Sequence, residues 1–282
     1  MSNLSREVNI ARELARTCGK IALDLQRQGH TALRPIEKSN DEGTVTEADI
    51  LLNQKIVETI AQAFPNDAIL AEESFQTSDR GQKNRCWFID PIDGTRDYAQ
   101  GLPSWAIHIG LADRGRPVFG LVYEPAQYRC SWATKDDAQF WSEVSGEIKA
   151  HSPTSPACSE QWRAITSKNH GDPSVDQALL SVGISSERHL KSGSTGVKLA
   201  TLAHGEAEIY VHPVNKTKLW DTCAPQVILE AAGGTITDVF GNPLQYDSPS
   251  ISHPHGLLAT SRVTHRSIVE SFAPMAKQWF QP

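Results

Sequence analysis

Residues 87–97, W-F-I-D-P-I-D-G-T-R-D, constrain the fold of this chain more than any other stretch. The stretch begins as an apolar run, which is typical of a buried strand. Asp and Pro are disfavoured inside strands, so we expect the strand to end at Asp90. The turn that follows presents two carboxylates, the Ile92 carbonyl and the Thr95 hydroxyl. Hard cations such as Mg²⁺ are bound by oxygen sets of this kind.

The same turn also offers hydrogen-bond donors. If Gly94 and Thr95 open a short helix, their amides point toward a bound anion. A turn that presents oxygens to a metal and amides to an anion suits the chemistry of phosphate esters. The alternative is an ordinary surface turn rich in Asp, Pro and Gly, and the motif alone does not separate the two.

The remaining pattern predicts one or two closely packed domains in a chain of 282 residues. Helices are expected over residues 4–28, 46–64, 174–182, 195–204, 222–232 and 264–280. Further strands are expected over 68–71, 105–111, 117–123, 128–134, 163–166, 207–212, 235–238 and 256–259. We expect residues 1–150 to form an α+β metal-binding half with an antiparallel sheet, and residues 151–282 an α/β half with substrate contacts. Layered sheets with helices between them are the predicted architecture.

Composition excludes several classes of partner. A net charge of -6 argues against a binder of polymeric nucleic acid, which needs a basic surface. Charges interrupt every long apolar stretch, including the N-terminal one, so neither a membrane span nor a secretory signal is expected. The five scattered cysteines lack a C-x-x-C motif and are expected to be reduced thiols. We therefore expect a cytoplasmic protein, and the turn at 90–95 indicates a small phosphorylated substrate as its partner.

Further acidic residues occur where helices begin or strands end. Asp49 lies in the first turn of the second predicted helix, Glu72 follows the strand over 68–71, and Asp221 is placed to cap the helix over 222–232. Each has a local explanation when taken alone. Gathering Glu72, Asp221 and the two aspartates of the turn is costly because like charges repel. Two or three Mg²⁺ ions would turn that repulsion into attraction.

Taken in order, these motifs resemble the inositol monophosphatase superfamily of lithium-sensitive, Mg²⁺-dependent phosphomonoesterases. The resemblance is carried by V-T-E-A-D at 45–49, E-E-S at 72–74, D-P-I-D-G-T at 90–95, W-D-T-C-A-P at 220–225 and E-A-A-G-G at 230–234. It extends from the first predicted helix to the last. It implies a layered αβαβα sandwich, and homodimers are frequent in that superfamily, so a homodimer is one expected assembly.

The resemblance also implies a set of metal ligands. Glu72, Asp90 and the Ile92 carbonyl would hold a first Mg²⁺, and Asp90, Asp93 and Asp221 a second. The first glutamate of the E-E pair is the expected ligand, rather than Glu73.

By the same resemblance, Asp49 and Glu72 lie where a third, weaker metal and the attacking water are organised. Thr95 would orient that water, assisted by Asp49, and these three residues are the predicted catalytic set. In-line phosphoryl transfer depends mainly on positioning and charge, so no nucleophilic serine is required. No G-x-S-x-G motif is present, which disfavours a hydrolase of the nucleophile-elbow type.

Two segments of the second half bear on the substrate. S-K-N-H at 167–170 resembles a segment of the 3′(2′),5′-bisphosphate nucleotidase branch, which removes the 3′-phosphate of 3′-phosphoadenosine 5′-phosphate. The glycine-serine segment at 193–198 also resembles that branch, and its lysine would contact the second phosphate. The predicted substrate contacts are Asp93, Gly94, Thr95, Lys168, His170, Ser194, Thr195, Gly196 and Lys198.

Three functions stay open at this point. A bisphosphate nucleotidase is favoured, partly because Val214 stands where the inositol-specific branch has a glutamate. An inositol 1-phosphatase or another sugar-phosphate phosphatase of the superfamily is the second. A non-catalytic metal-dependent binding protein is the third, and the intact ligand set argues against it. Lys168 replaces an arginine of the nucleotidase pattern and so lacks the bidentate fork that grips phosphate.

Overall fold

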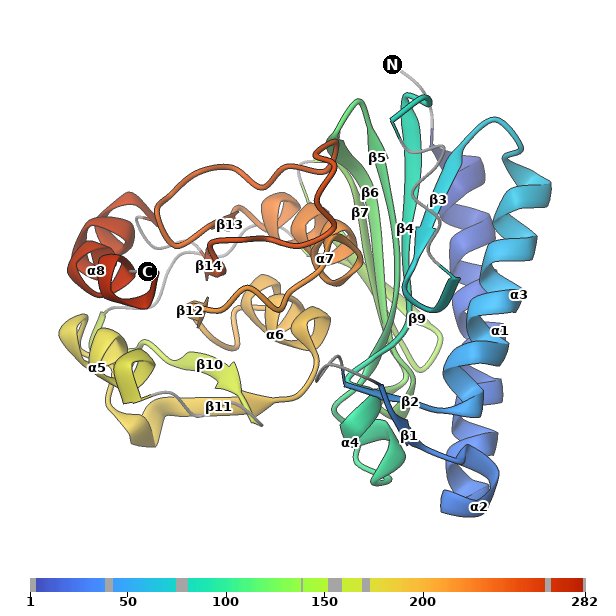
Figure 1. Cartoon of the computed structure of the whole chain (residues 1–282), viewed down its shortest axis with the longest axis horizontal. Coiled ribbons are helices and arrows are strands. Elements are labelled where there is room, and N and C mark those ends of the chain that lie inside the picture. Colours follow the sequence, from blue (N-terminus) through green and yellow to red (C-terminus); the bar gives the residue numbers. More distant parts are fainter. Residues whose placement is uncertain are drawn as a thin grey trace.

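The computed structural model describes residues 4–38, 43–74, 81–137, 139–151, 159–168, 173–261 and 265–280. These residues form five layers (Figure 1): two helices, a seven-stranded sheet, two more helices, a five-stranded sheet and a last pair of helices. The predicted αβαβα sandwich is confirmed. None of the described helices is both long and apolar enough to cross a bilayer.

The first layer consists of α1 (Ser5–Gln28) and α3 (Glu47–Ala63), which cover the outer face of the large sheet. The apolar positions of α1 recur at helical spacing, and Ala11, Leu14, Ala15 and Cys18 are buried. Thr46 is the N-cap of α3. Short elements connect the two helices: α2 (His30–Leu33), β1 (Ile36–Glu37) and β2 (Thr44–Val45).

The large sheet follows the chain order from β3 to β9. β3 and β4 are parallel and every later neighbour is antiparallel. Its strands are β3 (Ala68–Ala71), β4 (Arg85–Asp93), β5 (Ala106–Asp113), β6 (Arg116–Glu124), β7 (Arg129–Thr134), β8 (Phe140–Val144) and β9 (Glu147–His151). The sequence did not predict β8 and β9. β9 lies at the sheet edge with four of its five residues exposed, so it has no buried alternation to detect.

The small sheet has the order β11-β10-β12-β14-β13 and mixes parallel with antiparallel pairs. Its strands are β10 (Ala164–Ser167), β11 (His189–Ser192), β12 (Ile209–His212), β13 (Thr235–Thr237) and β14 (Leu257–Thr260). The helices α6 (Thr195–Ala203) and α7 (Leu219–Ala231) lie between the sheets, and α5 (Pro173–Ser181) and α8 (His265–Trp279) form the last layer.

The remaining described elements are short. α4 (Thr95–Ala99) follows β4, and single 3₁₀ turns occur at Glu72–Ser74, Pro125–Gln127, Ser159–Gln161 and Ser186–Arg188. No disulfide joins the four cysteines in the described part of the chain, and all four are buried: Cys18, Cys86, Cys130 and Cys223. Cys158 lies outside the described residues.

The two halves of the chain share a core. Phe88 of β4 packs in one cluster with Leu199 of α6 and Trp220 of α7. The large sheet ends at His151, next to the predicted division between residues 1–150 and 151–282. The division into these two halves stays a prediction.

The close approach of α7 to the large sheet depends on glycine. A Cβ on Gly120 of β6 would lie 2.0 Å from the Ala224 carbonyl oxygen, and one on Gly110 of β5 would lie 2.8 Å from the Ala224 nitrogen. Both positions therefore leave room for the helix backbone. This contact places the first turn of α7, which carries Asp221, against the sheet.

We expect Gly120→Ala to lower the free energy of unfolding by about 1–3 kcal/mol, the usual cost of overpacking a core. The added methyl must push β6 away from α7. Gly81→Ala is the matched control, because a Cβ at Gly81 has no neighbour within 4 Å. Urea unfolding of both variants measures the effect. Wild-type stability of Gly120→Ala would contradict this packing argument.

Candidate metal and phosphate site

The strand that carries the first two aspartates is longer than predicted. β4 continues through Pro91 and ends at Asp93, so the expectation that it ends at Asp90 is wrong. Asp90 pairs with His108 and Asp93 pairs with Ala106, so one extra residue on β4 forms a bulge. A proline is tolerated there because the bulge interrupts the hydrogen-bond ladder.

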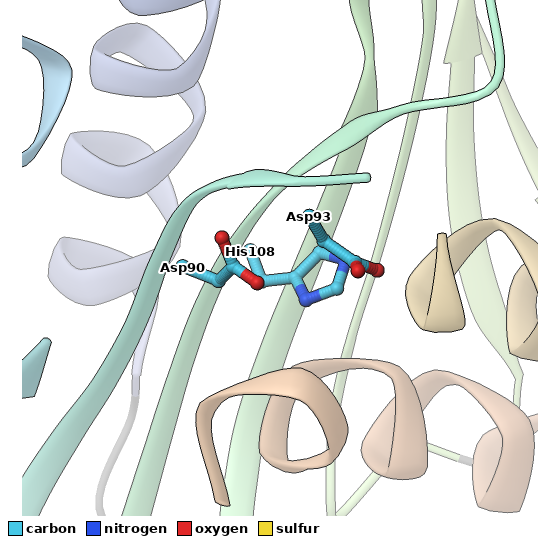
Figure 2. Close-up of side chains that lie close together, drawn as sticks. All are labelled: Asp90, Asp93 and His108. Carbon is cyan, nitrogen blue, oxygen red and sulfur yellow. The ribbon is translucent and has the colours of Figure 1, made fainter. Parts of the chain in front are cut away.

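The bulge brings the two carboxylates together. Residues three apart in a regular strand point to opposite faces, whereas one extra residue restores a common face. Ligand atoms of Asp90, Asp93 and His108 lie within 4.8 Å of one another. Figure 2 shows the three side chains close together. Among the His, Cys, Asp and Glu side chains of the described residues, these three form the group that is compact enough to hold a metal ion.

The turn after Asp90 is held by local hydrogen bonds. The Ile92 amide donates to Asp90 Oδ1 at 3.0 Å. The Thr95 hydroxyl lies 2.9 Å from the Ile92 carbonyl oxygen and 2.9 Å from Asp49 Oδ1. Gly94 has a φ of +93°, and a Cβ there would lie 2.8 Å from the Ser104 carbonyl oxygen. The structure therefore brings Thr95 and Asp49 together, and their catalytic roles stay predictions.

Asp49 is fully buried in the first turn of α3. Its Oδ2 accepts hydrogen bonds from the Thr46 amide and hydroxyl, and its Oδ1 accepts one from Thr95. Burial raises the pKa of Asp49 to about 7, although the hydrogen bonds from Thr46 lower it, while the nearby Glu72 raises it further. This carboxylate therefore changes its charge near neutral pH when no cation balances it.

We expect chelator-treated protein to lose thermal stability as the pH rises from about 5 to about 8. The pKa of Asp49 is about 7 when folded and close to 3.8 when unfolded. The native state thus binds the proton more tightly, and its stabilising contribution disappears as the pH passes through the folded pKa. Unfolding midpoints of wild type and Asp49→Asn in chelator test this. An equally steep decline in Asp49→Asn would contradict it.

Glu72 and Glu73 are held by a lysine that the sequence did not indicate. Glu72 follows β3 directly, in the 3₁₀ turn Glu72–Ser74. Lys38 Nζ lies 2.8 Å from Glu72 Oε1 and 2.6 Å from Glu73 Oε1. Lys38 is 34 residues from Glu72 in the chain, so only the fold reveals the pair. Burial and the charge of Glu72 raise the pKa of Glu73. A cation bound at Glu72 must share this carboxylate with the lysine.

Asp221 is not the predicted N-cap of α7, although its carboxylate caps the start of the helix from the third position. The helix begins at Leu219 with Lys218 as N-cap, and Asp221 is its third residue. Asp221 Oδ2 accepts a hydrogen bond from the Lys218 amide at 2.7 Å. The helix starts earlier because Leu219 and Trp220 are buried in the core between the sheets. Pro225 consequently lies in the second turn rather than the first.

The carboxylates act on one another electrostatically. Burial, followed by the charges of Glu72, Asp93 and Asp221, raises the pKa of Asp90 well above its ordinary value. Burial and the charges of Asp93 and Glu72 do the same for Asp221. Several buried acids with only oxygen donors fit a hard divalent cation, which would replace mutual repulsion by attraction.

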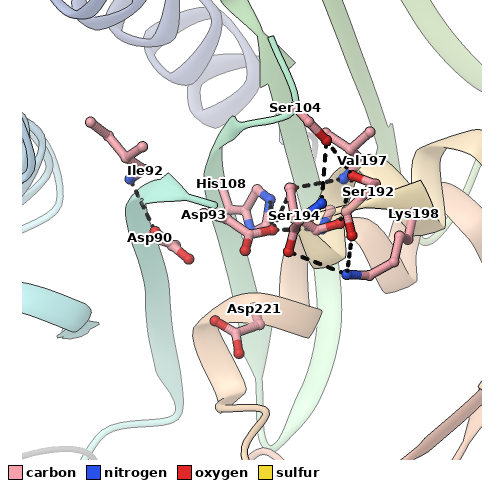
Figure 3. A network of polar contacts seen from close by, with 12 residues as sticks. Asp90, Ile92, Asp93, Ser104, His108, Ser192, Ser194, Val197, Lys198 and Asp221 are labelled. Atoms are coloured by element: carbon pink, nitrogen blue, oxygen red, sulfur yellow. Dashed lines mark hydrogen bonds and ion pairs between the residues drawn. The ribbon is translucent and has the colours of Figure 1, made fainter. Parts of the chain in front are cut away.

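The inner oxygen of Asp93 contacts the start of α6. Asp93 Oδ2 accepts hydrogen bonds from the Ser194 hydroxyl at 2.6 Å and the Gly196 amide at 2.8 Å. Ser194 is the N-cap of α6 and also accepts from the Val197 amide (Figure 3). The anion at this helix N-terminus is thus Asp93 itself. Direct contacts of Ser194, Thr195 and Gly196 with substrate stay predictions.

The two predicted lysine contacts differ in their burial. Lys198 is buried, and its Nζ lies 3.3 Å from the carbonyl oxygens of Ser192 and Gly193. Burial lowers the pKa of Lys198 to about 8, against the charges of nearby carboxylates, of which Asp93 acts most strongly. The more exposed Lys168 lies 3.4 Å from Asp97. His170 lies outside the described residues.

His108 is a site residue that the sequence did not indicate. Its ring is wholly buried, and Nε2 lies 3.2 Å from Asp93 Oδ2. It falls in a strand predicted from its apolar residues, and a lone histidine there carries no distinguishing pattern. Only the register of β4 and β5 places it beside the acidic turn.

Comparisons with known proteins agree with this geometry. A family described as the inositol monophosphatase family matches residues 3–274. A 3′(2′),5′-bisphosphate nucleotidase 1 from Rattus norvegicus is 28% identical over 92% of this chain and 92% of its own length. A 3′(2′),5′-bisphosphate nucleotidase from Salmonella typhimurium is 29% identical over 83% of this chain and 91% of its own length.

Solved structures share the same fold. An IMPase from Thermotoga maritima superposes with a TM-score of 0.76 at 22% identity, covering 97% of this chain and 99% of its own. An inositol monophosphatase from Staphylococcus aureus has a TM-score of 0.75 at 21% identity, covering 99% and 100%. At this level of identity the likeness concerns the fold.

Proposed function

The chain belongs to the inositol monophosphatase family of phosphatases, and we propose that it hydrolyses the 3′-phosphate of 3′-phosphoadenosine 5′-phosphate with the help of Mg²⁺. One observation carries the proposal: ligand atoms of Asp90, Asp93 and His108 lie within 4.8 Å of one another, where burial and the charges of Glu72, Asp93 and Asp221 raise the pKa of Asp90. Buried carboxylates of like charge need cations to balance their repulsion. A phosphatase needs cations as well, to neutralise the charge on the phosphoryl oxygens.

The donor set fits the proposed metals. Glu72, Asp90 and the Ile92 carbonyl would hold one Mg²⁺, and Asp90, Asp93 and Asp221 the other. Bound Mg²⁺ would neutralise charge on the phosphoryl oxygens and activate a water for attack. The hydrogen bonds to Asp93 Oδ2 leave its Oδ1 for the cation.

We propose that Thr95 orients the attacking water. Its hydroxyl lies between Asp49 Oδ1 and the Ile92 carbonyl oxygen, each 2.9 Å away, and donates its one proton to one of them at a time. A lone pair is then left to accept a hydrogen bond from water. Asp49, fixed by Thr46, holds this hydroxyl in place, so the pair supports in-line displacement by positioning.

The choice of a bisphosphate substrate rests on two supports. The relatives from Rattus norvegicus and Salmonella typhimurium carry the name of that activity. Lys198 places an amine close enough to Asp93, Asp221 and Asp97 for their charges to affect it, at the edge of the acidic cluster. A second phosphate would need a cationic contact of this kind, separate from the metals. Lys168 and His170 are the other proposed contacts.

One observation favours an inositol 1-phosphatase instead. The Lys198 amine faces two backbone carbonyls and lies 5.3 Å from the centre of the Tyr210 ring. In this arrangement the amine stabilises the segment before α6 and is not free to bind a phosphate. A substrate with a single phosphate would require no change here.

A phosphate-release panel with Mg²⁺ distinguishes these substrates. The panel compares 3′-phosphoadenosine 5′-phosphate, inositol 1-phosphate and fructose 1,6-bisphosphate at equal concentrations. We expect the highest kcat/KM for the bisphosphate nucleotide. Much faster turnover of inositol 1-phosphate would overturn the proposed substrate while leaving the phosphatase assignment intact.

A further inference from the structure

His108 lies where three parts of the proposed site meet. It stands on β5 directly opposite Asp90, and its Nε2 lies 3.2 Å from Asp93 Oδ2. Its ring borders the Trp220 backbone, one residue before Asp221. Figure 3 shows the imidazole beside Asp93 and Ser194. The side chain is completely buried, so its position is fixed by packing rather than by solvent.

His108 contacts Asp93 Oδ2, the same oxygen that accepts hydrogen bonds from the start of α6. Asp93 Oδ2 already accepts hydrogen bonds from Ser194 and Gly196. The Nε2 contact is of ion-pair length without the direction of a good hydrogen bond. A carboxylate accepts and does not donate, so the stabilising form of this contact has the proton on Nε2. Two hydrogen bonds and the contact with His108 therefore surround Oδ2, and Oδ1 is left for a cation.

Proximity alone would also allow His108 to be a metal ligand together with Asp90 and Asp93. The backbone of Gly196 argues against Nε2 as the ligating atom. A Cβ on Gly196 would lie 1.9 Å from His108 Nε2, so the glycine backbone packs against this nitrogen. With Gly196 on one side and Asp93 Oδ2 on another, Nε2 lacks the clear approach that a ligand to a metal needs.

We infer that His108 is a positioning residue that holds Asp93 Oδ2, so that Asp93 Oδ1 is presented to the cation. This inference rests on the proposed function, in which Asp93 is a metal ligand. Groups that orient a ligating side chain commonly contribute about 10–100-fold to metal affinity. Without His108, Ser194 and Gly196 still bind Oδ2, but the carboxylate gains freedom to rotate away from the cation.

Three variants separate the contact with Asp93 from the volume of the ring. In His108→Gln the amide nitrogen reaches the place of Nε2 and keeps a donor toward Asp93. In His108→Asn the amide stops near the place of Nδ1 and cannot reach Asp93. His108→Leu fills the core without any donor. Calorimetric titration of chelator-stripped protein with Mg²⁺ gives the dissociation constant of each, and unfolding midpoints report its folding.

We expect His108→Asn and His108→Leu to raise the Mg²⁺ dissociation constant about 10-fold or more, and His108→Gln to stay within about 3-fold of wild type. Equal weakening in all three variants would overturn the inference, because a ligand or a packing role predicts that result. Unchanged affinity in all three would overturn it as well. Wild-type protein that binds no Mg²⁺ would instead refute the proposed metal mechanism, and this inference with it.

Discussion

Replacing Asp221 by Asn should lower the rate of Mg²⁺-dependent phosphate release by at least about 10³-fold, equivalent to roughly 4 kcal/mol of transition-state stabilisation. Asn keeps the size of the side chain and an oxygen that can accept the Lys218 amide hydrogen bond. It removes the charge that would bind the second cation. The start of α7 therefore stays in place while the site loses its affinity for metal.

In the absence of metal, Asp221→Asn should be more stable than wild type. The pKa of Asp221 is raised by burial and by the charges of Asp93 and Glu72, so its ionised form destabilises the native state at neutral pH. Asn relieves this repulsion. We thus expect the unfolding midpoint in chelator to rise while activity falls, a combination that a misfolded variant cannot produce.

Asp24→Asn is a suitable control for Asp221→Asn. Asp24 is a half-exposed aspartate on α1, paired with Arg27 at the surface. It should change neither activity nor the metal dependence of stability. Activity close to wild type in Asp221→Asn would remove this carboxylate from the proposed ligand set.

Replacing Lys198 by Met should reduce kcat/KM for 3′-phosphoadenosine 5′-phosphate by about 10²-fold and affect a simple monophosphate far less. Hydrogen bonds from charged groups contribute about 1.5–3 kcal/mol, which corresponds to this range of rates. Met retains the apolar stem in a fully buried position. Initial rates on the two substrates, measured with the same enzyme preparation, give the ratio.

Lys191→Met is the matched control for this comparison. Lys191 lies on β11, just before the segment that leads to α6, and is exposed. Its replacement should leave both substrates unaffected. Equal losses on the two substrates in Lys198→Met would assign Lys198 to the support of the Ser192 and Gly193 carbonyls rather than to the second phosphate.

The sequence predicted layered sheets with helices between them and the local setting of Asp49 and Glu72, but it placed the end of β4 and the start of α7 wrongly. Asp90 and Asp93 follow an apolar run, Glu72 follows a short apolar strand, and Asp49 opens an amphipathic helix. These are local patterns, and strand ends and helix starts are where a site of this kind is built. Which carboxylates belong together came from the resemblance, since spacing along the chain does not bring residues 72 and 221 into contact.

What the sequence did not predict depends on contacts between distant segments. Lys38 meets Glu72 and Glu73 because the fold brings the segment after β1 beside the end of β3. His108 lies beside Asp93 because of a bulge in β4. Asp221 lies within α7, rather than before it, because the buried Leu219 is already part of the helix. Register shifts and helix starts of this kind are decided by packing, which no local pattern records.

We propose that the carboxylates of β4 and α7 form a cation site that drives phosphomonoester hydrolysis. The most direct measurement is phosphate release from 3′-phosphoadenosine 5′-phosphate by chelator-stripped protein, followed as Mg²⁺ is added back. We predict no release without the metal and a saturable recovery with it, accompanied by a rise in the unfolding midpoint. A rate that persists in excess chelator would rule out the proposed metal mechanism.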